Sequence, residues 1–171
     1  LARASYVAEE AKFGSFVGVF GHIASQYFNE YGNANDALAK IAVKNHANGM
    51  KNPLAQLQKA VTFDYCATAS EANPMVVSPL KRSDCSLVSD GAAAVLLRDT
   101  DHLQDAKRAV GLKAMAQVND YLPMSRRNMT RLEGCQRAWQ LALNAANLSI
   151  WDLDLVESHD CFTIAELMQY E

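Results

Sequence analysis

Apolar residues recur at intervals of three and four positions over residues 15–31, which predicts an amphipathic helix that ends at Gly32. A second stripe of this kind predicts a helix over residues 36–48, capped by Asn35. The stripe of the second helix consists of Leu38, Ile41, Ala42 and Asn45. Residues 1–60 lie outside the alternation of strands and helices that follows. They are therefore expected to form a helical insertion that packs on a sheet domain.

The pattern changes after these two helices. Residues 62–90 are rich in Ser, Thr, Asp, Asn and Pro, which predicts an extended connection with one short edge strand. Residues 91–97, GAAAVLL, form an apolar run without polar interruption, as is typical of a strand buried on both faces of a sheet. Apolar residues occupy every second position from 110 to 118, which predicts another strand.

Strand and helix patterns alternate in the last part of the chain. Residues 133–147 have the spacing of a helix, and residues 153–157 form a short strand-like run. A further helix is expected to begin at Thr163, because Thr163 and Glu166 have the spacing of a capping box. This order predicts an α/β fold with a largely parallel sheet.

Composition narrows the class of protein. Half of the 171 residues are apolar and 20% are charged, which is typical of a soluble domain with a sizeable core. The net charge of −3 argues against non-specific binding of nucleic acid, which requires a basic surface. The apolar runs are too short for a transmembrane helix. We therefore expect neither a nucleic-acid partner nor a membrane span.

The cysteines indicate the cellular compartment of the protein, and the ends of the chain indicate whether it is a fragment. The four cysteines are widely spaced and include no C-x-x-C pair, so they predict no zinc or redox motif. The first residues do not resemble a signal peptide, and reduced thiols in the cytoplasm are expected. Leu1 is not an initiator methionine, and Glu171 follows directly on a predicted helix with no stop signal. Both ends suggest an internal fragment of a longer protein.

The strongest candidate for chemistry is the run His159, Asp160 and Cys161. It lies at the carboxyl end of a predicted strand and before a helix, where open α/β sheets bind their ligands. A histidine placed there can hold a hydrogen bond to a developing oxyanion. Three alternatives stay open on position alone: a structural histidine, a Cys–His nucleophile pair, and zinc ligation, which lacks a partner pair elsewhere in the chain.

The residues themselves are more specific than their spacing. HDCFTIAELMQYE, at the end of the chain, resembles the thiolase superfamily, and in particular its sterol-carrier-type and acetyl-CoA acetyltransferase-like branch, which has H-D-C-F where most thiolases have N-E-A-F. NPMVVSPLKRSDCSLVSDGAAAVLL is similar to the end of the family's N-terminal half. NDYLPMSRRNMTRLEGCQRAWQLALNAANLSIWDLDLVE is similar to the start of its C-terminal half. YFNEYGNANDALAKIAVKNHANGMKNP looks like the helical loop domain that covers the active site.

The resemblance implies a fold and a division of the chain. The parent fold consists of α-β-α-β-α layers, which this chain would form only incompletely. Residues 1–60 would be the helical loop-domain lid, residues 61–108 the end of the N-terminal half and residues 109–171 the start of the C-terminal half. Because core strands would be missing, GAAAVLL is expected to stay partly uncovered in this chain alone.

The resemblance also implies an activity. Thiolases are acyl-CoA acyltransferases of lipid and fatty-acid metabolism that cleave 3-ketoacyl-CoA by thiolysis or run the reverse Claisen condensation. Their substrates are coenzyme A thioesters, they hold no covalently bound cofactor or metal, and they form homodimers or homotetramers. The nucleophilic cysteine and the base would lie outside this chain, so the 171 residues alone are predicted to be inactive. The alternative is a catalytically incomplete thiolase-like protein that binds acyl-CoA or serves as a structural partner.

Single residues inherit roles from the matching positions. His159 would take the place of the N-E-A-F asparagine in an oxyanion hole that polarises the thioester oxygen. Ser86 would contact the pantetheine arm of coenzyme A. Asp160, Cys161 and Phe162 would lie behind His159 and support it or pack around it.

The other cysteines and the basic residues carry weaker expectations. Cys66 has small neighbours like those of the family's nucleophile, but it follows the loop domain and is rejected for that reason. Cys85 and Cys135 are expected to be buried small apolar residues. Lys81 and Arg82, with the pair at positions 126 and 127, would either meet the phosphates of coenzyme A or be solvated surface charges.

Overall fold

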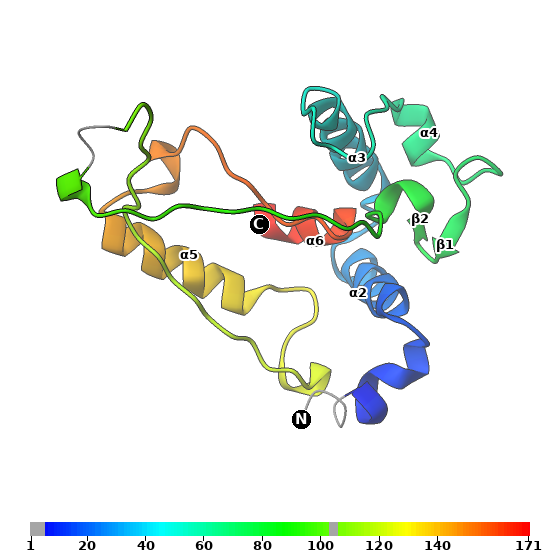
Figure 1. Ribbon diagram of the computed structural model, residues 1–171. Coiled ribbons are helices and arrows are strands. Elements are labelled where there is room, and N and C mark those ends of the chain that lie inside the picture. Colours follow the sequence, from blue (N-terminus) through cyan, green and yellow to red (C-terminus); the bar gives the residue numbers. More distant parts are fainter. Residues whose placement is uncertain (1–5, 103–105) are drawn as a thin grey trace.

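The structure is a computed structural model that describes residues 6–102 and 106–171 (Figure 1). Its short helical turns are η1 (Tyr6–Glu10), η2 (Ala11–Phe13), η3 (Arg82–Asp84), η4 (Thr100–His102), η5 (Met124–Arg126) and η6 (Ile150–Asp152). Its α-helices are α2 (Phe16–Tyr31), α3 (Asn35–Gly49), α4 (Phe63–Ala67), α5 (Glu133–Ala146) and α6 (Thr163–Tyr170), and its strands are β1 (Met75–Val77) and β2 (Leu80–Lys81).

The predicted helices are confirmed, with corrections at the caps of α3 and α6. Helix α2 begins after Ser15, whose hydroxyl accepts a hydrogen bond from the Gly18 N–H at 3.1 Å, and it ends at Gly32 with a φ of 94°. Helix α3 is not capped by the Asn35 side chain. Asn33 instead accepts a hydrogen bond from the backbone N–H of Asn35 at 2.9 Å. Asn35 lies inside the first turn, which leaves its amide group available for contacts elsewhere in the fold.

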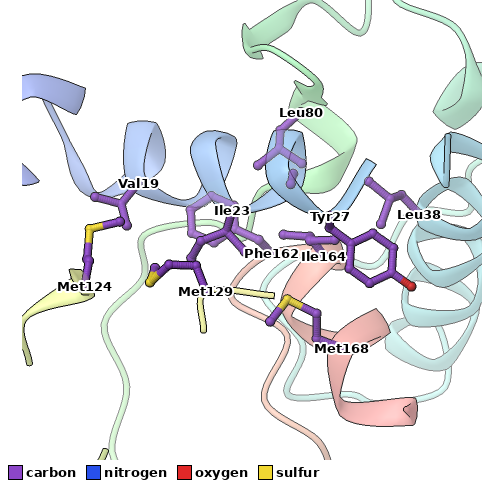
Figure 2. Packing of buried hydrophobic residues seen from close by; sticks show 11 residues of the cluster. Val19, Ile23, Tyr27, Leu38, Leu80, Met124, Met129, Phe162, Ile164 and Met168 are labelled. Atoms are coloured by element: carbon purple, nitrogen blue, oxygen red, sulfur yellow. The ribbon is translucent and has the colours of Figure 1, made fainter. Parts of the chain in front are cut away.

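Helix α6 lies at the centre of the molecule, next to α2 and α3 (Figure 1). Its residue Ile164 is completely buried, as are Leu38 of α3 and Leu80 of β2. The side chains of this cluster come from segments at both ends of the chain (Figure 2). The buried members of the cluster are Val19, Ile23, Ala24, Tyr27, Leu38, Leu80, Met124, Met129, Phe162, Ile164 and Met168. The first two long helices therefore pack on the last helix, and α2 also packs on the β1–β2 hairpin.

The sheet differs from the prediction. Within the described residues, the strands form one antiparallel pair, β1 with β2, in which Met75 faces Lys81 and Val77 faces Leu80. The strands predicted over residues 91–97, 110–118 and 153–157 are not formed. A strand exists only through hydrogen bonds to a neighbouring strand, and no described segment provides such a ladder to these residues.

Because the predicted strand is not formed, the apolar run at residues 91–97 is not buried either. It was predicted to be buried on both faces, yet Leu96 is 90% exposed. Figure 1 shows this part of the chain as a long extended trace that leaves the helical core and returns along α5. The expectation that this run stays uncovered in the chain alone is confirmed. Among the described helices, none is both long and apolar enough to cross a membrane.

Gly21 allows α2 to approach the β1–β2 hairpin. A Cβ atom at this position would lie 2.8 Å from both terminal carbons of Val77 and 3.2 Å from the carbonyl oxygen of Ser78. We expect Gly21→Ala to lower the free energy of unfolding by about 1–3 kcal/mol, because the hairpin must move to make room. Urea denaturation measures the free energy of unfolding of the variant and the unchanged protein. Gly49→Ala at the end of α3, where the nearest atom is 3.4 Å away, is the control and should be close to neutral. An equal effect of the two substitutions would contradict the close approach.

Candidate functional site

The structure brings two of the predicted site segments into backbone contact. Cys85 and Phe162 form an isolated antiparallel bridge, and the Ser86 N–H donates a hydrogen bond to the Cys161 carbonyl at 3.1 Å. The side chains of Ser86 and His159 are exposed on this part of the surface. The His159 carbonyl accepts a hydrogen bond from the Gln169 side chain of α6 at 2.7 Å. A ligand held by Ser86 would therefore lie near the His159 segment.

Asp160 and Cys161 point toward more enclosed surroundings. The Asp160 carboxylate is partly buried and accepts a hydrogen bond from the Asn45 side chain of α3. Burial, and then the charge of Glu166, raise the pKa of Asp160 above its ordinary value. Burial also raises the pKa of the Cys161 thiol, so the thiolate that a nucleophile requires is disfavoured. This environment speaks against the Cys–His nucleophile pair.

Phe162 is a core residue. It is 4% exposed and stacks on Phe20 of α2 with ring centroids 4.3 Å apart. Phe16, one turn earlier on α2, tilts against Phe162 at 5.7 Å. The packing places Phe162 between the candidate site and the helical core, so the position of the site segment depends on α2.

The predicted capping box at the start of α6 is wrong. Phe162 is the N-cap residue, and the Thr163 hydroxyl donates a buried hydrogen bond to Asp84 at 2.9 Å instead of accepting one from the helix. Glu166 does not reach back to the cap, because its carboxylate is bound by residues of α3 and by Tyr170. The two side chains that fit the local motif serve contacts between distant segments.

Glu166 is 1% exposed and is surrounded by donors. Lys44 and Tyr170 donate hydrogen bonds to Oε1, and Asn45 donates to Oε2 at 2.6 Å. Burial alone would raise the pKa of Glu166, but the hydrogen bonds from these side chains and the charge of Lys44 hold it below its ordinary value. The carboxylate is therefore kept ionised and fully partnered beside Asp160.

Lys81 fits neither interpretation made from the sequence. Its side chain is 2% exposed, so it is not a solvated charge and does not face a phosphate group in solution. Its ammonium group lies 3.0 Å from an Asp84 oxygen and donates a hydrogen bond to the Asn35 side chain at 2.7 Å. Both interpretations of Lys81 were wrong, because its acidic partner three positions further on was not recognised.

The other basic residues stay closer to the surface. Arg82 and Arg126 are exposed, and the guanidinium group of Arg126 lies over the Tyr121 ring at 4.6 Å. Arg127 pairs with Asp120 at 3.8 Å. Both Arg126 and Arg127 therefore contact residues of the same loop.

Burial raises the pKa of three of the four cysteine thiols, Cys66, Cys85 and Cys161. All four are free, and Cys66 is completely buried, which raises the pKa of its thiol. The predicted burial of Cys85 and Cys135 is wrong in degree, since both are only partly buried. Burial, helped by the charge of Asp84, raises the pKa of Cys85 to about 11. The environment of Cys66 supports its rejection as a nucleophile.

A hollow that borders α6 is lined by neither His159 nor Ser86. It has a volume of about 540 Å³ and runs between α5, α6 and the end of α2. Its walls include Trp139 and Cys135 of α5 and Met168 of α6. Helix α5 has no buried residue, so this hollow is the partly uncovered apolar face of that helix.

Sequence reasoning missed Lys44 and Asn45 as neighbours of the site. They belong to α3, in the segment predicted to form the lid, and contact Asp160 and Glu166 near the other end of the chain. One signal was present: Asn45 is a polar residue in the otherwise apolar stripe of its helix. A buried amide in such a stripe requires a hydrogen-bonding partner.

The arrangement of the helices and extended segments matches that of a solved structure. The structure matches the solved Ltp2-ChsH2(DUF35) aldolase with a TM-score of 0.81 and 22% identity, over 97% of this chain and 44% of that one. This agreement shows that the helices and extended segments are arranged as in the corresponding part of a larger fold. The predicted fold class, an incomplete thiolase-like α/β fold, is confirmed. No family model matches the chain.

The curated relatives are more specific. The chain is 36% identical over its whole length to an acetyl-CoA acetyltransferase of Methanothermobacter thermautotrophicus and 32% identical to one of Methanocaldococcus jannaschii, and it covers 44% of each. It is 30% identical to sterol carrier protein 2 of Gallus gallus over 90% of this chain and 28% of the relative. The chain thus spans less than half the length of these relatives. It is a homologue of acetyl-CoA acetyltransferases and sterol carrier protein 2, and the resemblance to this branch of the thiolases is confirmed.

Proposed function

We propose that the protein containing this chain is a thiolase-like acyl-CoA acyltransferase. It would cleave 3-ketoacyl-CoA by thiolysis or condense two acetyl-CoA molecules in the reverse direction. The observation that carries the proposal is the contact between the Ser86 segment and the His159 segment, in a chain homologous to acetyl-CoA acetyltransferases along its whole length. The nucleophilic cysteine and the base would be supplied by residues outside this chain.

His159 would act where negative charge develops. In the condensation, a base removes a proton from the methyl carbon of acetyl-CoA, and the charge moves to the thioester oxygen. An imidazole N–H of His159, directly or through a water molecule, would donate a hydrogen bond to that oxygen. The enolate carbon then attacks the acyl group on the nucleophilic cysteine, a C–C bond forms, and the cysteine thiolate leaves. Thiolysis runs the same steps in reverse.

Ser86 would orient the substrate rather than react with it. Its exposed hydroxyl can exchange a hydrogen bond with an amide of the pantetheine arm, while its backbone is held against Cys161. Holding the arm at this place would present the thioester to His159. Of the basic residues predicted to meet the phosphates of coenzyme A, Arg82 and Arg126 are the ones with exposed side chains.

The role of His159 is tested on the full-length protein. We expect His159→Ala to lower kcat for 3-ketoacyl-CoA thiolysis by about 10²–10³, because one oxyanion-hole donor is lost. His159→Asn, which restores the donor of the commoner N-E-A-F motif, should recover a large part of the activity. Absorbance at the wavelength of the 3-ketoacyl-CoA enolate follows turnover. An active protein whose kcat is unchanged by His159→Ala would overturn the assignment.

The second candidate is a thiolase-like protein that binds acyl-CoA without turning it over. One observation favours it: relatives of this chain are named sterol carrier protein 2 and non-specific lipid-transfer protein-like 2. Titration calorimetry with acetyl-CoA separates the candidates. Saturable binding without thiolysis by the full-length protein would select the second one.

We further propose a cytoplasmic location and a homodimeric or homotetrameric assembly. The four free cysteines support a reducing compartment. The exposed apolar residues of the extended segments, such as Val95 and Leu112, support burial against further polypeptide.

A further inference from the structure

One side-chain amide joins the two carboxylates behind the candidate site. The Asn45 Nδ2 atom donates hydrogen bonds to Asp160 and, at 2.6 Å, to Glu166. Asn45 lies in α3, Glu166 lies in α6, and Asp160 precedes α6 by a short connection. The contacts therefore link the helix predicted to belong to the lid with the segment that carries His159.

The Glu166 end of this link is rigid. Its carboxylate is completely enclosed and also accepts hydrogen bonds from Lys44 and Tyr170, so that both of its oxygens are occupied. Lys44 additionally donates a hydrogen bond to the Tyr170 hydroxyl at 2.7 Å. A carboxylate with all its partners in place cannot turn without losing several charge-assisted hydrogen bonds. It holds the Asn45 amide in one orientation.

The Asp160 end transmits this rigidity to His159. Asp160 and His159 share a peptide bond, and the Gln169 side chain holds the carbonyl of that bond at 2.7 Å. Fixing the Asp160 carboxylate and this carbonyl restricts the peptide group that follows the His159 Cα atom. The imidazole is exposed and has little packing of its own, so its position depends on this backbone.

We propose that Asn45 is a positioning residue that acts on the reaction through His159. This inference rests on the proposed function of His159 and names the side chain that keeps the imidazole in register with the thioester oxygen. The sensitivity of an oxyanion hole to geometry gives the expected size of the effect, because a displacement of about 1 Å lowers rates by about 10²-fold. The amide suits this role because it donates to two carboxylates that would otherwise repel each other.

The test is a double-mutant cycle in the full-length protein. We expect Asn45→Ala to lower kcat by about tenfold or more, with the KM for 3-ketoacyl-CoA changed by less than about twofold. In the His159→Ala background the same substitution should have no further effect on kcat. Lys40→Ala, on the exposed side of α3, is the matched control and should leave kcat unchanged in both backgrounds.

The outcomes separate this inference from the proposed function. An equal loss of kcat from Asn45→Ala with and without His159 would show a general structural role and overturn the inference, while His159→Ala still tests the oxyanion hole. If His159→Ala alone has no effect, the proposed role of His159 fails first. Should Asn45→Ala not fold, as judged by circular dichroism, Asn45→Gln keeps the amide but displaces it and carries the same cycle.

Discussion

Replacement of Asp84 by Asn is expected to lower the free energy of unfolding by about 3–5 kcal/mol. Both charges of the Lys81–Asp84 pair are buried, with side chains 2% and 0% exposed. Removing the negative charge leaves the Lys81 ammonium enclosed without a counter-ion, and its remaining acceptor among the hydrogen bonds described is the Asn35 side chain. The same oxygens of Asp84 accept hydrogen bonds from the Lys81 N–H at 2.8 Å and from Thr163.

The double variant Lys81→Met/Asp84→Asn is the control for this prediction. It removes both charges and keeps their approximate volume, so a large part of the lost stability should return. Urea denaturation followed by circular dichroism measures the three proteins. If Asp84→Asn costs less than about 1 kcal/mol, the pair is not as enclosed as the structure has it. Because Asp84 binds Thr163 at the start of α6, the single variant should also loosen the contact between the Ser86 and His159 segments.

Phe162→Ala is also expected to lower the free energy of unfolding by about 3–5 kcal/mol, because it creates a cavity in the core. The ring is buried against Phe20 and belongs to the main apolar cluster (Figure 2). Truncation would leave a cavity between α2 and the start of α6, which the surrounding helices can close only in part. It would also remove the aromatic contact that holds the site segment on the core.

Phe16→Ala is the matched control for this truncation. Phe16 touches the same ring but is 65% exposed, so its loss should cost about 0.5 kcal/mol or less. Thermal unfolding of the two variants under identical conditions compares them directly. Equal shifts of the melting temperature would contradict the burial that the structure assigns to Phe162. Phe162→Leu, which fills much of the cavity, should fall between the two.

The helices were predictable because their signals are local. The stripes over residues 15–31 and 133–147 correspond to α2 and α5, and Gly32 ends the first of them as expected. Their backbone hydrogen bonds join residues four positions apart, so a short window of sequence contains the necessary information. The strand predictions had no such support. The runs at 91–97 and 110–118 have the composition of buried strands, but a strand also requires neighbours that no described part of this chain supplies.

In the candidate site, too, some features could be predicted from the sequence and others could not. The place of His159 before a helix could be read from the order of the elements, and its role and that of Ser86 came from the resemblance to thiolases. The contact between the two segments follows from the bridge between Cys85 and Phe162, which joins positions far apart in the sequence. The support from Asn45 was not predicted, although a polar residue in an apolar stripe was the available signal.

Local motifs were least reliable where a polar side chain had a distant partner. Thr163 and Glu166 match a capping box, and Asn35 matches an N-cap, yet each makes its contacts with another segment. A buried carboxylate or amide is more stable with charged or polar partners in the core than with a single local hydrogen bond. Such partners cannot be recognised in a short window.

By itself the sequence determined where the main helices lie, which family the chain resembles and which segment carries the candidate histidine. Only the tertiary structure decided which charges are buried as pairs, which apolar runs stay uncovered, and which residue of α3 binds Asp160. The physical reason is range: helix formation depends on neighbours within a few positions, whereas strand pairing, ion-pair burial and side-chain support depend on residues that meet only when the chain is folded.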